Sequence, residues 1–205
     1  MKACLHAGVK IYGINAEVFP SQWEYQIGNC KGIEVSDDLF MARFLMQRVA
    51  EKYGASVCLE PKLFKNWNGS GCHTNYSTKQ TREDDGIKEI KKHLDELAKY
   101  HKDFIYLYGE GNEQRLSGNY ETSDINVFSY GVMNRKASVR IPKGTEETGK
   151  GYYEDRRPSS NCDPYIVPSL IFSVTCLDGK LVSEIKSTYT KFLNEKLTNF
   201  PPDVS

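Results

Sequence analysis

Apolar residues recur along this chain with two different periods, and this mixture restricts the fold more than any other feature. Three stretches place an apolar residue at about every third or fourth position, as amphipathic helices do: residues 39–53, 82–101 and 183–200. Two shorter stretches, residues 137–142 and 152–156, have the character of short strands. A chain of 205 residues can bury one sizeable core. The pattern therefore predicts an α+β fold in one domain, or in one domain with an appendage.

Turn residues and apolar runs place further elements. The pair Pro20-Ser21 predicts a turn between two strands within residues 8–28. Residues 55–59 have the composition of a buried strand. A helix is expected from near Pro168, because proline suits a first helical turn.

Charge balance and cysteine pattern limit the class of protein. Lysine plus arginine total 27, as do aspartate plus glutamate, so the chain lacks the basic excess typical of a generic nucleic-acid binder. No apolar run reaches the length of a membrane span, and the N-terminal residues lack the apolar region of a signal peptide. The six cysteines contain no C-x-x-C pair and are expected to be reduced. We therefore expect a cytoplasmic protein with no nucleic-acid or membrane partner.

The most informative motif is the glycine-bearing segment at residues 66–78. Gly69 and Gly71 flank Ser70, so the backbone there can approach a ligand closely. His73 follows, and an imidazole is among the commonest metal ligands. Amide side chains beside exposed backbone N–H groups suit a carboxylate or phosphate oxygen. Taken alone, the segment is more typical of a glycine-rich turn with a surface histidine, and the other motifs decide its meaning.

Two carboxylates are expected to face each other across the first hairpin. A turn centred between Pro20 and Ser21 places Glu17 directly opposite Glu24. Directly opposed Cβ atoms lie about 4.5–5.5 Å apart, and like charges there are destabilising. A divalent cation that bridges the two carboxylates would remove the repulsion. The alternative is that one glutamate points to solvent beside a bulge that breaks the register.

Two strand segments carry arginine. Glu154 and Arg156 are two residues apart and so share a strand face. They form either an ordinary salt bridge or a metal-ligating carboxylate beside a guanidinium that clamps an anionic substrate. Arg140 lies on the polar face of the strand at residues 137–142, and Arg135 precedes it. A guanidinium binds phosphate or carboxylate bidentately, although a solvated basic strand has the same pattern.

A loop with glycine completes the set of motifs. Arg115 and Glu121 flank Gly118, and such a loop can close over a site as a flap. Many ordinary loops have the same composition, so its meaning depends on the other motifs.

Together these segments resemble the eukaryotic-type glutamine synthetases, in that family's order and at close to its spacing. The segments are NAEVFPSQWEYQIG (15–28), NWNGSGCHTNYST (66–78), RLSGNYETS (115–123), NRKASVRIP (134–142) and GYYEDRRPSSNCDPY (151–165). The resemblance implies that residues 1–177 form the family's catalytic domain, in which an antiparallel sheet lines the active site and helices pack outside, as in guanido-kinase-like folds. Residues 178–205 resemble nothing in the family and are predicted to form an amphipathic helical tail.

The resemblance also implies an activity, the ATP-dependent ligation of ammonia to L-glutamate through γ-glutamyl phosphate, with Mg²⁺ or Mn²⁺. By position, the implied metal ligands are Glu17, Glu24, His73 and Glu154. The implied catalytic residues are Glu121, Arg135 and Arg140. The implied glutamate-binding residues are Asn68, Gly69, Arg115 and Arg156. The implied ATP-binding residues are Glu24, Asn75, Ser77, Arg135, Arg140 and Tyr152.

Two features depart from the family pattern. The chain begins inside that pattern, so the N-terminal β-grasp domain and its metal-binding carboxylates are expected to be missing. In the family this domain of a neighbouring subunit completes the site, so we expect a form that needs the domain in trans, as a homo-oligomer or in mixed rings with full-length glutamine synthetase. Tyr120 stands where the family usually has histidine, which would alter flap closure. The alternatives are a catalytically inactive structural or regulatory subunit of such rings, and a γ-glutamyl ligase that uses an amine.

Overall fold

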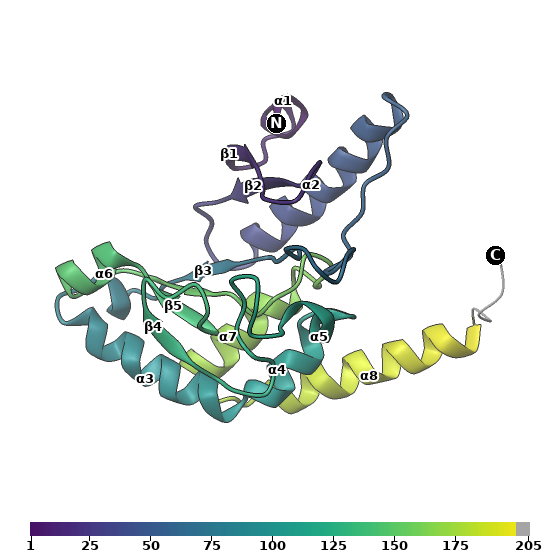
Figure 1. Cartoon of the computed structure of the whole chain (residues 1–205). Helices are drawn as coiled ribbons and strands as arrows, with labels where there is room; N and C mark the ends of the chain where they lie inside the picture. Colours follow the sequence, from purple (N-terminus) through teal and green to yellow (C-terminus); the bar gives the residue numbers. More distant parts are fainter. Residues whose placement is uncertain (200–205) are drawn as a thin grey trace.

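The chain folds into a small N-terminal lobe and a larger body (Figure 1). A computed structural model describes residues 1–199. The lobe consists of α1 (Lys2–His6), β1 (Ile11–Ala16), β2 (Trp23–Ile27) and α2 (Glu34–Glu51). Its core is small and contains Cys4, Val9, Ile11 and Ala42. The lobe therefore leaves much of its apolar surface uncovered.

The predicted hairpin forms, but in a different register. β1 and β2 pair antiparallel with Asn15 opposite Glu24, and the Glu17 N–H donates to the Gln22 carbonyl at 2.9 Å. Glu17 is therefore not directly opposite Glu24, and that prediction is wrong by two residues. Because positions 15 and 17 share a face, Glu17 becomes the diagonal neighbour of Glu24, a separation that long side chains can bridge.

A four-stranded sheet in the body provides the framework for the site. In spatial order its strands are β3 (Thr74–Tyr76), β6 (Tyr153–Asp155), β5 (Val139–Ile141) and β4 (Tyr130–Val132). β6 pairs antiparallel with β3 and with β5, whereas β4 runs parallel to β5. The fold is α+β as predicted. The sheet is mixed rather than antiparallel throughout, because β4 runs in the same direction as its neighbour.

Helices of the body supply most of the main core. They are α3 (Gly86–Lys99), α4 (His101–Leu107) and α7 (Ile166–Cys176), with the shorter η1 (Gln80–Arg82), α5 (Asn112–Arg115) and α6 (Lys143–Thr148) around them. α7 contacts both α3 and α4. The predicted apolar face of α3 is confirmed, because Ile90, Leu94 and Leu97 are fully buried. The segment 82–101 is not one helix, since extended Glu83 separates η1 from α3.

The C-terminal helix α8 (Val182–Asn199) packs against α4 and α7 and then runs out beyond the body (Figure 1). Ile185 and Tyr189 contact the main core, whereas Phe192 is exposed. The helix predicted over residues 183–200 is therefore observed, and its predicted last residue lies outside the described part of the chain. None of the helices within residues 1–199 has both the length and the apolar character needed to cross a bilayer.

Residues 55–59 do not form the predicted strand. They run between α2 and the glycine-bearing loop without regular structure, and most of them are exposed. No strand within residues 1–199 pairs with them. Without a neighbouring strand or a core to enter, this apolar run stays at the surface, so the prediction is wrong.

Candidate active site

Three strands place polar residues in a row on one face of the main sheet. In the pairing of β3, β6 and β5, Asn75 lies opposite Glu154 and Glu154 lies opposite Arg140. The Arg140 Nε–Glu154 Oε2 distance is 2.7 Å, although the N–H is not aligned for a hydrogen bond. Arg156, two residues along β6, donates from Nη1 to Glu154 Oε2 at 3.1 Å. Glu154 and Arg156 thus share a face, as their spacing predicted.

His73 approaches the same carboxylate from the loop before β3. Its Nδ1 lies 3.7 Å from Glu154 Oε1. Desolvation by the surrounding protein and the positive charges of Arg156, Arg115 and Arg140 hold the pKa of His73 well below its usual 6.5. The ring is therefore neutral at physiological pH, and 38% of its side-chain surface is accessible. A neutral, accessible imidazole is the form that ligates a metal ion.

The hairpin brings a second acidic pair to this region. A hydrogen bond between the Glu17 and Glu24 side chains raises the pKa of Glu17 and lowers that of Glu24. The charge of Glu121 adds to the rise at Glu17, and that of Arg156 adds to the fall at Glu24. Gln26 Nε2 donates to Glu24 Oε1 at 2.8 Å and orients it. The two hairpin carboxylates therefore lie within electrostatic range of the flap and of the sheet.

The predicted flap contacts both arginine segments. Glu121 Oε1 lies 3.4 Å from Arg135 Nη1. Arg156 donates to the backbone carbonyls of Arg135 and Glu121, at 3.2 and 3.3 Å. Tyr120 and Glu121 both have positive φ, 52° and 60°, a conformation that L-residues adopt at a cost of about 1–3 kcal/mol. The surrounding contacts hold this strained turn against Arg156.

Arg115 has a different place from the one that its predicted role suggests. It is buried, and its Nη2 donates to the backbone carbonyls of Arg156, Arg157 and Pro158 at 2.6–3.2 Å. Its Nε donates to Asn112 Oδ1 at 3.0 Å. In this structure Arg115 therefore ties α5 to the chain that leaves β6, and its glutamate contact stays a prediction.

The glycine-bearing loop depends on its glycines for this packing. A Cβ on Gly69 would collide with the Pro61 carbonyl oxygen and lie 2.8 Å from Arg115 Cγ. Gln22 Nε2 donates to the Gly69 carbonyl at 3.3 Å and to Ser70 Oγ at 2.8 Å, which joins the hairpin turn to the loop. The half-buried Asn68 precedes Gly69. The motif is thus a close approach of three segments rather than an open turn.

The remaining predicted ATP-binding residues lie at one end of the β3–β6 pair. Tyr76 pairs with Tyr153, so Ser77 and Tyr152 follow at the same end. Ser77 Oγ accepts from Arg82 Nη1 at 2.8 Å, and the Tyr152 side chain is exposed. Tyr152 lies two positions before Glu154 in the sequence, and Ser77 lies two positions after Asn75, the residue opposite Glu154.

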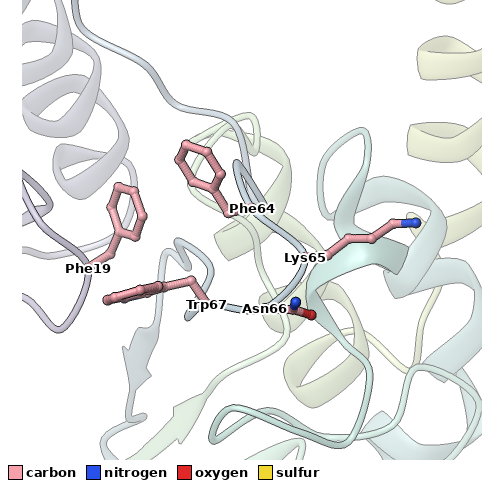
Figure 2. Close-up of a pocket in the computed structure, with 5 residues that line it drawn as sticks. All are labelled: Phe19, Phe64, Lys65, Asn66 and Trp67. Carbon is pink, nitrogen blue, oxygen red and sulfur yellow. The ribbon is translucent and has the colours of Figure 1, made fainter.

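An aromatic hollow of about 430 Å³ lies beside the loop. Figure 2 shows the rings of Phe19, Phe64 and Trp67 turned toward one another, with the Lys65 side chain directed away. The Phe19 ring stacks on Phe64 with centroids 5.2 Å apart, and Trp67 meets Phe19 edge-on at 5.7 Å. This cluster fastens the hairpin turn to the loop, and nothing in the sequence motifs predicted it.

The sequence reasoning also missed the support on the opposite face of β6. Asp155 accepts from Arg157 Nε at 2.9 Å and Nη2 at 2.7 Å, and from the Tyr108 hydroxyl at 2.9 Å. Arg157 also contacts His101 Nδ1 at 3.2 Å and lies over the Phe104 ring. The alternation E-D-R-R was the available signal, because residues 155 and 157 must face the core when 154 and 156 face the site.

The donor residues suit a divalent ion in kind, but they are gathered in two pairs. Glu17 and Glu24 form one pair, and His73 and Glu154 form the other. Within residues 1–199 no group of three or more His, Cys, Asp or Glu side chains is placed to hold an ion. The elevated pKa of Glu17 is the sign of two carboxylates that compete for one proton, a repulsion that a divalent cation would relieve.

Comparison with known proteins gives a consistent family. Residues 1–105 match the family described as glutamine synthetase, catalytic domain. A glutamine synthetase cytosolic isozyme from Pinus sylvestris is 55% identical over 177 residues, which cover 86% of this chain and 50% of that protein. The glutamine synthetase of Debaryomyces hansenii is 56% identical over 85% of this chain and 48% of its own length. Glutamine synthetase 2 cytoplasmic from Drosophila melanogaster is 54% identical, with 86% and 49% covered. The chain thus spans about half the length of these relatives.

Proposed function

This chain belongs to the glutamine synthetase family, and from that premise we propose that it takes part in the ATP-dependent ligation of ammonia to L-glutamate. One observation carries the proposal. Three strands align Asn75, Glu154 and Arg140, and Arg156 and a neutral His73 lie beside them. A carboxylate surrounded by guanidinium groups and an imidazole suits charged substrates and a metal ion.

We propose that Glu17, Glu24, His73 and Glu154 hold Mg²⁺ or Mn²⁺. Carboxylate oxygens are the donors these ions prefer, and the neutral imidazole adds a nitrogen. When bound, the ions neutralise the charge of the phosphate groups. Because Arg140 and Arg156 occupy one oxygen of Glu154, its other oxygen, which faces His73, is the one available to an ion.

We propose that Arg135 and Arg140 bind the phosphate groups of ATP. Each is paired with a carboxylate, Glu121 or Glu154, at 3.4 and 2.7 Å. A phosphate also binds a guanidinium bidentately, so an incoming phosphate would compete with the carboxylates for these two groups. The γ-carboxylate of glutamate then attacks the γ-phosphorus and ADP leaves; ammonia attacks the resulting acyl phosphate and inorganic phosphate leaves. Release of Glu121 from Arg135 would leave its carboxylate free to help bind ammonium.

The other substrate contacts follow from the same geometry. Asn75, Ser77 and Tyr152 lie along the β3–β6 pair, where we propose that the nucleotide binds. We propose that Asn68 and Gly69 contact glutamate and that Arg156 binds a glutamate carboxylate. Arg115 could do so only after it released backbone carbonyls, so we propose that it mainly holds the loop in place.

We further propose that residues 1–177 act as the catalytic domain and that residues 178–205 form an added tail. The cytoplasm is the proposed location, since one relative is named a cytosolic isozyme and the name of another includes the word cytoplasmic.

The assay is ADP formation that depends on both glutamate and ammonia. Because the chain spans about half of its relatives, the purified chain is measured alone and mixed with a full-length glutamine synthetase inactivated at its own catalytic carboxylates. Activity in either sample that is lost in Glu24→Gln, but kept in the surface control Glu51→Gln, supports the proposal. ADP formation in neither sample would contradict it.

A second function is favoured by the exposed apolar surface of the N-terminal lobe. Tyr12, Trp23, Phe40, Phe44 and Tyr53 each expose more than half of their surface. Where exposed apolar side chains lie together, they mark interaction sites. The chain would then be a structural or regulatory subunit that assembles with itself or with full-length glutamine synthetase. Co-purification with a tagged full-length enzyme, without activity, would support this function, and failure to co-assemble would exclude it.

A further inference from the structure

Two cysteines distant in sequence lie on neighbouring segments beside the site. The glycine-bearing loop and the chain after β6 are joined by an antiparallel bridge between Gly71 and Ser159. The Cys72 N–H donates to the Pro158 carbonyl at 2.9 Å, and the Ser160 N–H donates to the Ser70 carbonyl at 3.1 Å. These bonds bring Cys72 close to the turn that carries Cys162.

Cys162 lies in the main hydrophobic core and Cys72 packs against the same core, so the two thiol groups are neighbours. Cys162 is buried, with 1% of its surface exposed, whereas Cys72 is only partly buried. Arg43 from α2 donates to the carbonyls of Ser160 and Cys162, both at 2.8 Å, and lies 3.9 Å from Cys162 Sγ. Cys162 is therefore held in place, and Cys72 is the less buried of the two cysteines.

We propose that Cys72 and Cys162 are an oxidation site of this protein and form a reversible disulfide with peroxide as the oxidant. The Cys72 sulfur attacks one peroxide oxygen, the O–O bond breaks, and water leaves, so that Cys72 becomes a sulfenic acid. The Cys162 sulfur then attacks the Cys72 sulfur, an S–S bond forms, and the S–O bond breaks with loss of a second water. Two thiols lose two electrons and two protons, and one hydrogen peroxide becomes two waters. A dithiol reductant reverses the bond by exchange.

The bond would alter the neighbouring site. An S–S bond is about 2.0 Å long, shorter than a contact between two thiol groups, so it draws the loop toward residue 162. His73 follows Cys72 directly. Its Nε2 lies 3.0 Å from the point that a Cβ on Gly71 would occupy, so the His73 ring packs against the same loop. The disulfide therefore shifts His73 relative to Glu154. This consequence rests on the proposed function, whereas formation of the disulfide does not.

The test treats the full chain with a small excess of hydrogen peroxide, followed by non-reducing peptide mapping by mass spectrometry. We expect a cross-linked peptide pair that contains residues 72 and 162, loss of two of the six thiols, and return of both thiols with dithiothreitol. The exposed Cys58 and Cys176 are internal controls for simple surface oxidation. Cys162→Ser should leave Cys72 as a sulfenic acid that a dimedone probe traps.

Other results would overturn the proposal. Adducts confined to Cys58 and Cys176, or disulfides that join other cysteines while residues 72 and 162 stay reduced, would show that the pair is inert. The wild-type map alone decides this, even if a variant fails to fold. Mn²⁺ binding measured before and after oxidation then tests the consequence for His73 separately, since a disulfide without altered binding contradicts only the proposed role of His73.

Discussion

Asp155 supports the site from the core side of β6, and removal of its carboxylate should destabilise the fold strongly. Asp155 and Arg157 are both fully buried. The carboxylate accepts three hydrogen bonds from Arg157, including one from its backbone N–H at 3.1 Å, and one from the Tyr108 hydroxyl. Asp155→Asn keeps the shape but leaves the guanidinium buried without a counter-charge. Breaking a buried pair in this way costs about 3–5 kcal/mol.

Urea unfolding followed by circular dichroism measures this cost. With a slope of roughly 2–3 kcal/mol per molar urea, a loss of about 4 kcal/mol lowers the midpoint by about 1.5 M. Asp84→Asn is the matched control, because Asp84 pairs with Lys150 at 2.6 Å but is almost fully exposed, and no measurable change is expected.

A double substitution separates charge from packing. Asp155→Asn combined with Arg157→Met removes both charges, and such replacements are often neutral for stability. We expect the double variant to be more stable than Asp155→Asn alone. The reasoning would be refuted if Asp155→Asn cost less than about 1 kcal/mol, well below the 3–5 kcal/mol expected for a broken buried pair, or if the double variant were the least stable of the three.

Two further predictions concern the loop and the pH dependence of folding. Gly69→Ala should displace the loop, because the added Cβ would meet the Pro61 carbonyl oxygen and Arg115, and it should lower the free energy of unfolding by about 1–3 kcal/mol in the same urea assay. Gly144→Ala is the control, because no atom lies within 4 Å of the Cβ that it would add, and no loss of stability is expected. Equal losses in the two variants would disprove the argument. Burial and the charge of Arg157 lower the pKa of His101 below 6.5 in the folded state, so below pH 6.5 the unfolded chain binds the proton more readily. The contribution of the neutral His101 to stability is therefore complete above pH 6.5 and is lost as the pH falls toward the lower pKa of the folded state. Over that pH range the urea midpoint should decline less steeply in His101→Gln than in the unaltered chain. Identical pH profiles of the two proteins would contradict this prediction.

The sequence predicted best those features that depend on local periodicity. The apolar face of α3 and the shared face of Glu154 and Arg156 follow from periods of 3.6 and 2 residues. The hairpin register could not be derived, because a turn of a few residues allows several pairings, and the observed one moves Glu17 by two positions. Residues 55–59 show that an apolar run specifies no strand without a partner.

The sequence also could not predict which polar side chains bind backbone groups instead of a ligand. Arg115 has the same motif position whether its guanidinium faces a ligand or the carbonyls of residues 156–158, and only the packed structure distinguishes the two. The pairing of β4 with β5 in parallel is likewise a long-range outcome that no local pattern encodes.

The most direct test of the account is metal-dependent ATP binding, measured by titration calorimetry on the purified chain. We predict that ATP binds in the presence of Mg²⁺ or Mn²⁺, that binding weakens without the ion, and that Arg140→Gln and Glu24→Gln reduce it while Glu51→Gln does not. If ATP bound neither with the ions nor without them, or if the three variants behaved alike, the strand row at Glu154 and the hairpin carboxylates would not form a nucleotide site.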